Sequence, residues 1–109
     1  MARRLLRLVV PSPDRSRVLA RPNGLAGWTL PVIAVPDDDD VTWTDDLVAA
    51  AGRAVGAAVQ PARPVGTGAW ELRALGRIPS TGVTWIARDE AGRLGAHAAV
   101  LIRWADDEG

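Results

Sequence analysis

One stretch of the chain has the pattern of a helix, and short β-rich runs lie on both sides of it. The segment "TDDLVAAAGRAVGAAV", from Thr44 to Val59, repeats apolar residues at helical spacing. Thr44 is a good N-cap, and Asp45 and Asp46 would interact favourably with the helix dipole in the first turn. Prolines follow the segment and are expected to end the helix. A chain of 109 residues with one such helix is expected to pack it against a sheet.

The other apolar runs are short and bounded by turn residues, which is typical of strands. The predicted strands are Leu5–Val10, Arg17–Ala20, Trp28–Val35, Val65–Gly76, Thr81–Asp89 and Ala96–Ala105. We expect the first two to pair as a hairpin, and Pro31 to make the third an edge or bulged strand. The last run also suits a short helix, but its β-forming residues favour a strand. The predicted fold class is α/β: one mixed, largely antiparallel sheet packed against one main helix, an α/β sandwich over residues 1–109.

Composition excludes several classes of function. The formal net charge is zero, so no overall field attracts nucleic acid or an anionic membrane. Cysteine is absent, which excludes disulfides, thiolate metal sites and cysteine nucleophiles. No apolar run approaches the roughly 20 residues that a membrane helix needs. We therefore expect a soluble, cytoplasmic protein without a membrane partner, and nucleic acid is a disfavoured ligand.

Three segments together resemble the Nudix hydrolase family. They are "RVLARPN", then "GWTLP", and then "GRAVGAAV" within the predicted helix. Members of this family hydrolyse nucleoside diphosphates linked to another moiety. Their signature glutamates bind magnesium or manganese, which neutralises the pyrophosphate and activates water. The resemblance therefore implies a Nudix-like fold, a nucleotide-like ligand and a divalent cation.

The catalytic part of the signature is incomplete in this chain. Arg53 matches the signature arginine, and Asp45 falls where the first glutamate belongs. The three later glutamate positions are occupied by Ala54, Ala57 and Ala58, whose side chains offer no oxygen to a cation. Asp45 and Arg53 are thus remnants of the signature, and we predict no metal site, no cofactor and no catalytic residue. The resemblance points to a degenerate Nudix domain that is not an enzyme.

Other candidate residues have simpler explanations. The run Asp37–Asp40 is expected to be a solvated loop, since it lacks the spacing of a calcium loop. His97 is the only histidine, and we interpret it as structural or exposed. The five tryptophans are the only aromatic residues, and most should lie in the core. One or two can still form a binding surface, for which Trp28 and Trp43 are the candidates together with Arg53.

The function expected from these features is binding or packing on a partner. The predicted helix has a face of small residues with little charge, formed by Ala50, Ala54, Gly56 and Ala57 beside Arg53. Such a face favours a homodimer or docking on a partner domain.

Two alternatives remain open. One is a divergent hydrolase of a nucleoside diphosphate-type pyrophosphate, using magnesium or manganese held by Asp37–Asp40, Asp45 and Glu71. The other is a sensor that keeps a pocket for a nucleotide-like small molecule. With a strand at its end, the chain would lack the C-terminal helix of the Nudix sandwich, which suggests the N-terminal domain of a longer protein.

Overall fold

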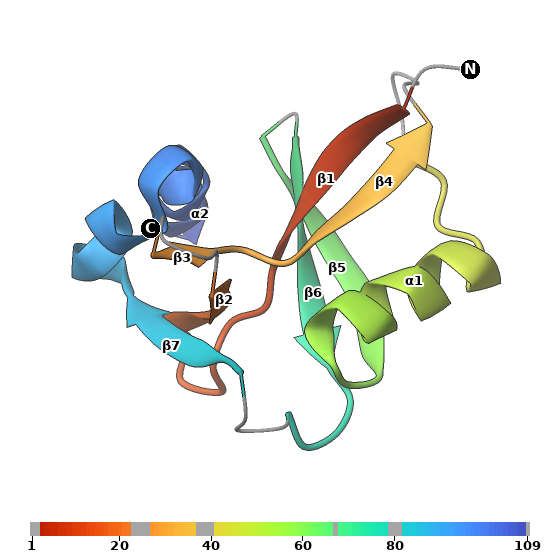
Figure 1. Ribbon diagram of the computed structural model, residues 1–109, viewed down its shortest axis with the longest axis horizontal. Helices are drawn as coiled ribbons and strands as arrows, with labels where there is room; N and C mark the ends of the chain where they lie inside the picture. The colour runs from red at the N-terminus through yellow and green to blue at the C-terminus, as the bar shows by residue number, and fades with distance from the viewer. Residues whose placement is uncertain (1–2, 23–26, 37–40, 67, 79–81, 109) are drawn as a thin grey trace.

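The structure, a computed structural model, describes residues 3–22, 27–36, 41–66, 68–78 and 82–108. Its elements follow the order β-β-β-β-α-β-β-β and then a helical C-terminal part (Figure 1). They are β1 (Arg3–Val9), β2 (Arg17–Pro22), β3 (Trp28–Thr29), β4 (Val32–Pro36), α1 (Asp45–Val55), β5 (Val59–Val65), β6 (Ala69–Ala74), β7 (Thr84–Ala87), η2 (Arg88–His97) and α2 (Ala98–Glu108). The predicted α/β class is confirmed, but the described strands form two sheets rather than one.

The strands divide into a four-stranded sheet, β4-β1-β6-β5, and a three-stranded sheet, β3-β2-β7. In the larger sheet β1 runs parallel to β6 and antiparallel to β4, and β5 is antiparallel to β6. The pairs of the smaller sheet are antiparallel. The expected hairpin of the first two strands is only partly formed: β1 and β2 belong to different sheets, and beyond the end of β1 an isolated bridge joins Pro11 to Val18, beside a hydrogen bond from the Leu19 amide to the Val10 carbonyl.

Alternation along the strands of the larger sheet divides the core in two. Leu6, Leu8 and Leu72 lie in a cluster with Ala51 and Val55 of α1. The residues of the opposite face, which include Val9 and Ala69, lie in a second cluster with Leu101 and Trp104 of α2. Because side chains alternate between the faces of a strand, α1 and α2 cover opposite faces of this sheet. The expectation of one main helix is therefore corrected to two.

The start of α1 agrees with the sequence, whereas its end comes earlier than expected. The Thr44 hydroxyl accepts a hydrogen bond from the Leu47 amide at 3.2 Å, and Asp45 and Asp46 lie in the first turn. The helix ends at Val55 because Gly56 adopts a left-handed backbone with φ of 87°, a conformation that glycine tolerates best.

The segment after α1 is a hairpin rather than the single predicted strand Val65–Gly76. β5 begins at Val59 and contains Pro61 and Pro64, which we expected only to end the helix. Proline lacks the amide donor of a ladder, but β5 is an edge strand, where this loss is tolerated. The hairpin reverses direction with Gly66 at φ of 64°.

The C-terminal part is helical, so the expected strand Ala96–Ala105 is wrong. Residues 88–97 form a kinked run of 3-10 turns, η2, and α2 follows directly. Leu101 and Trp104 are fully buried while Ile102 is 54% exposed, a spacing that belongs to a helix and not to a strand. The alanines at positions 98, 99 and 105 favour this helix. β-propensity misled the prediction because Val100, Leu101 and Trp104, which also suit a strand, lie on or near the helix face that packs against the core.

The strand predicted over Trp28–Val35 is interrupted. β3 ends at Thr29 and joins the smaller sheet, whereas β4 begins at Val32 and forms an edge of the larger one. Pro31 lies between them, and its carbonyl accepts a hydrogen bond from the Leu8 amide at 2.8 Å. The proline therefore marks the transfer of the chain from one sheet to the other.

Candidate functional site

A cavity lies where the two sheets separate. β1 pairs with β6 only from Arg7↔Ala69 to Val9↔Glu71, after which the chain enters the turn that leads to β2. β6 continues to Ala74, so within the described residues its last part has no strand partner on that side. The β1–β2 turn, the end of β6 and Trp85 of β7 border a cavity of about 760 Å³ that is partly open to solvent.

The lining of this inter-sheet cavity combines apolar and charged residues. The apolar part is formed by Pro11, Pro13, Leu72, Ile78 and Trp85, together with small residues. The charged part is formed by Arg15, Glu71, Arg73 and Arg77. Three arginines thus face one carboxylate, and a ligand in the cavity would meet an excess of positive charge.

Glu71 is buried, with only 5% of its surface exposed, and its carboxylate is fully engaged. Arg15 donates to both oxygens, from Nη2 to Oε1 at 2.9 Å and from Nη1 to Oε2 at 3.2 Å. The indole of Trp104 donates to Oε1 at 2.7 Å, and Arg63 Nε lies 3.2 Å from the same oxygen. Burial acts to raise the pKa of Glu71, but these hydrogen bonds and arginine charges outweigh it and lower that pKa.

Arginine side chains also cover the Trp104 ring. The guanidinium carbons of Arg88 and Arg15 lie 4.8 and 5.6 Å from its centroid, within the range of cation–π attraction. Arg88 further donates from Nη2 to the Arg15 carbonyl at 2.8 Å. Glu71 and Trp104 therefore connect β6, α2 and the β1–β2 turn.

The turn that carries Arg15 is held by a network around Asp14. The Asp14 Oδ1 atom accepts hydrogen bonds from the hydroxyls of Ser12 and Ser16, both at 2.7 Å, and from the Ser16 amide at 3.1 Å. These bonds lower the pKa of Asp14 to about 2. Arg15 adopts φ of 60°, an uncommon value for a residue other than glycine. The network thus fixes the backbone from which Arg15 reaches Glu71.

The residues that match the Nudix signature do not converge on one point. Asp45 and Arg53 are exposed at opposite ends of α1. Ala54 packs against the core from within α1, while Ala57 and Ala58 lie beyond its C-cap, in the connection to β5. In the part of the chain that the structure describes, no group of three or more histidine, aspartate or glutamate side chains could hold a metal ion.

Glu71 is also separated from Asp45. Its neighbour Leu72 packs on the α1 side of the sheet, while Glu71 bonds to Trp104 on the α2 side. The remaining acids of the alternative hydrolase site, Asp37–Asp40, lie outside the described residues. Glu71 therefore does not fit the donor set that a magnesium or manganese ion would need.

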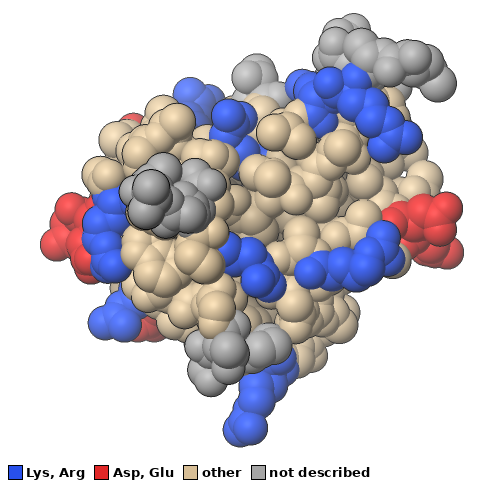
Figure 2. All heavy atoms as spheres, in the orientation of Figure 1, with Lys and Arg blue, Asp and Glu red and all other residues tan. Residues whose placement is uncertain are grey.

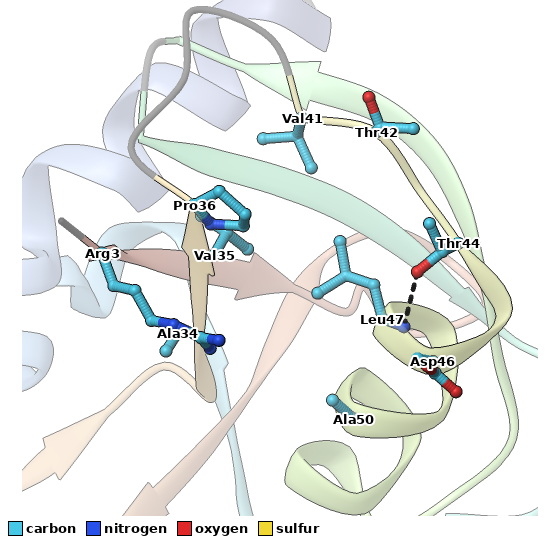
Figure 3. A pocket seen from close by; sticks show the side chains of 10 residues that line it. All are labelled: Arg3, Ala34, Val35, Pro36, Val41, Thr42, Thr44, Asp46, Leu47 and Ala50. Carbon is cyan, nitrogen blue, oxygen red and sulfur yellow. Dashed lines mark hydrogen bonds between the residues drawn. The ribbon is translucent and has the colours of Figure 1, made fainter. Parts of the chain in front are cut away.

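A second pocket, of about 350 Å³, lies at the start of α1 between the ends of β1 and β4 (Figure 3). Arg3 borders it from the β1 side, and Thr44, Asp46 and Leu47 border it from the helix. The Thr44 hydroxyl already accepts a hydrogen bond from the Leu47 amide. Its polar lining consists of Arg3, Thr42, Thr44 and Asp46, and we assign no ligand to it.

The two tryptophans singled out from the sequence lie away from the inter-sheet cavity. Trp28 packs against the core on the α2 side. Trp43 packs edge-on against Trp70, with centroids 5.7 Å apart, on the α1 side. The tryptophan that lines the cavity is Trp85. Nothing in the local sequence separates Trp85 from the others, because the cavity arises from strand pairing between distant segments.

His97 has a structural setting. Its Nε2 atom lies 3.0 Å from the Thr29 hydroxyl, and the contact links the end of η2 to β3. Burial, and then the nearby charge of Arg7, lower the pKa of His97, which favours a neutral ring near pH 7. This setting agrees with the interpretation of His97 as a structural residue.

The fold and the cavity define an α/β sandwich with an arginine-lined cavity at the junction of its two sheets. Arginines are spread over the face seen in Figure 2, whereas acidic residues gather mainly toward its left and right margins. No protein-family model and no curated protein matches the sequence. Among the described residues no helix is long and apolar enough to cross a membrane.

Proposed function

We propose that this chain is a non-catalytic Nudix-like domain that acts by binding a small molecule. The strand–helix order that follows the "GWTLP" segment supports the resemblance. The C-terminal helix α2 supports it further, because it covers the sheet face opposite α1 and so supplies the helix that completes a Nudix sandwich. The helix α2 also replaces the strand that the sequence predicted for the last part of the chain.

The observation that carries the proposal is that the Glu71 carboxylate is already bound by other side chains. This carboxylate is bound by Arg15, Arg63 and Trp104, and is therefore occupied in holding the fold together. The signature positions at Ala54, Ala57 and Ala58 offer no side-chain oxygen in its place. Metal-assisted hydrolysis needs several oxygen ligands aimed at one point, so the hydrolase alternative has less support than binding. The cavity favours the sensor form of the proposal.

We expect manganese titration to show no specific site. In calorimetry on protein stripped with a chelator, manganese should give only weak heats, without the micromolar affinity of a carboxylate cluster. Asp45→Ala and the neighbouring Asp46→Ala should leave the titration unchanged.

A micromolar site with one manganese per chain that disappears in Asp45→Ala but persists in Asp46→Ala would contradict this expectation. Manganese-dependent turnover of a nucleoside diphosphate derivative that Asp45→Ala abolishes would make the hydrolase alternative the better one.

Association through α1 has less support than the sequence suggested. Ala50, Ala54 and Ala57 are half-buried against the core, so of the predicted face only Gly56 and Arg53 are exposed. The exposed side of α1 carries Ala49 and Arg53 beside the acids of its first turn.

We therefore expect the wild-type chain to sediment as a monomer at micromolar concentration, as should Ala49→Glu. A wild-type dimer that Ala49→Glu dissociates would restore the homodimer proposal, with α1 at the interface.

A further inference from the structure

We propose that the inter-sheet cavity binds a small oxyanion, a phosphate ester or a carboxylate, that is attached to a planar aromatic ring. This inference rests on the proposed binding function and names the class of ligand. It differs from the position implied by the signature, since the cavity lies beside the β1–β2 turn and β6, and no residue of α1 lines it.

The cavity lies between the end of β6 and the segments that precede β2 and follow β6, where the topology separates the two sheets. β1 leaves β6 at the pair Val9↔Glu71 to reach the smaller sheet, while β6 continues to Ala74. The void of about 760 Å³ falls within the range of roughly 300–1,000 Å³ that is typical of small-molecule sites. The open edge of a strand also presents amide and carbonyl groups to whatever enters.

Charge selects an anionic ligand. Among the described residues Glu71 is the only acid in the lining, and its charge is balanced by Arg15 and Arg63. Arg73 and Arg77 are exposed at the cavity, and no carboxylate among the described residues forms an ion pair with either. Guanidinium groups match the planar, two-oxygen geometry of carboxylates and phosphates. These two arginines are therefore the proposed contacts of the oxyanion.

The apolar lining selects the rest of the ligand. Trp85 is half-buried and borders the cavity, with Leu72 and Ile78 on the β6 side and Pro11 on the turn. An aromatic side chain favours planar rings through stacking, and the aliphatic neighbours favour an apolar body. A bare inorganic anion would leave this surface uncovered, so the ring should contribute to affinity.

Phenyl phosphate and benzoate are suitable probes. Benzyl alcohol is the control that has the ring without the charge, and inorganic phosphate is the control that has the charge without the ring. We expect at least one of the two aromatic anions to bind by calorimetry and to shift the Trp85 indole signal in NMR spectra. Which of them binds more tightly distinguishes a phosphate ester from a carboxylate. Benzyl alcohol and inorganic phosphate should each bind at least about tenfold more weakly.

Variants separate a specific site from general attraction to arginine. The double variant Arg73→Ala, Arg77→Ala should weaken binding of the aromatic anion at least about tenfold, and Trp85→Ala should weaken it without affecting inorganic phosphate. Arg93→Ala, which removes an exposed arginine of η2 outside the cavity lining, should have no effect.

The inference is overturned if neither aromatic anion binds, if benzyl alcohol binds equally well, or if Arg93→Ala weakens binding as much as the double variant. These results would leave the absence of a manganese site untouched. Conversely, a manganese site would overturn the non-catalytic function without changing the binding of these probes.

Discussion

Replacing Glu71 by alanine is expected to destabilise the protein by about 1.5–3 kcal/mol, the range for a hydrogen bond to a charged group, because the buried Trp104 donor loses its acceptor while Arg15 and Arg63 are 41% and 34% exposed. The side chain is 7% exposed and receives donors from three different parts of the chain. Without it, the Trp104 indole loses its acceptor, and Arg15 and Arg63 are left close together. A loss of this size is a large fraction of the stability of a domain of this length.

Urea unfolding followed by tryptophan fluorescence measures this effect, and Glu90→Ala is its matched control. Glu90 pairs with Arg93 at 2.8 Å, but both side chains are 44% exposed. Exposed pairs contribute only about 0–1 kcal/mol, so Glu90→Ala should be nearly neutral. Equal losses for the two variants would contradict the structural role given to Glu71.

The dependence of stability on pH provides a second readout of the same group. Because the pKa of Glu71 is lowered in the folded state, its contribution is complete above the ordinary pKa of a glutamate and is lost as the pH falls below it. The wild type should therefore lose stability in acid more steeply than Glu71→Ala. Asp14, whose pKa is lowered to about 2, acts in the same direction and is retained in both proteins.

Replacing Trp104 is expected to give the second large loss of stability. Two substitutions separate the contribution of its volume from that of its hydrogen bond. Trp104→Ala removes a fully buried aromatic side chain, for which a loss of about 3–5 kcal/mol is typical. Trp104→Phe keeps most of the volume but removes the indole donor, which lies 2.7 Å from Glu71 Oε1. Hydrogen bonds to charged groups contribute about 1.5–3 kcal/mol, so the phenylalanine variant should lose at least that amount.

Trp70→Phe is the matched control for the hydrogen bond. The Trp70 indole nitrogen is buried and has no hydrogen-bond partner in the described part of the chain, so Trp70→Phe removes volume and no donated bond seen there. We expect Trp70→Phe to lose less stability than Trp104→Phe in the same urea experiment. If the two phenylalanine variants lose the same amount, the bond from Trp104 to Glu71 contributes little, and the cluster is held by arginine alone.

Local chemistry accounts for the parts of the fold that the sequence predicted correctly. Thr44 caps α1 because its hydroxyl reaches an amide only three residues away, and the following acids suit any helix start. The first two strands and the position of β7 also follow from short apolar runs between turn residues. Likewise, Ala54, Ala57 and Ala58 lack a side-chain oxygen in any fold.

Pairing between distant segments accounts for what the sequence left open. A one-helix interpretation failed because β-formers such as Val100 and Ile102 can also lie on a helix, and only packing against the second core cluster decides between the two. The prolines of β5 predict the end of a helix and not a strand. A strand tolerates them only at the edge of a sheet, and that position is a property of the sheet as a whole.

The candidate site depends most on the three-dimensional arrangement. Arg15 and Glu71 are 56 positions apart, and Glu71 and Trp104 are 33 positions apart, yet all three meet at one carboxylate. Local propensity acts over a few residues and gives no information about such contacts. Residue types and turn chemistry thus establish the start of α1, the first two strands and which side chains cannot be metal ligands. Burial and long-range pairing establish that Glu71 serves the fold and that an arginine-lined cavity opens where β1 leaves β6, because desolvation and charge pairing exist only once the chain is folded.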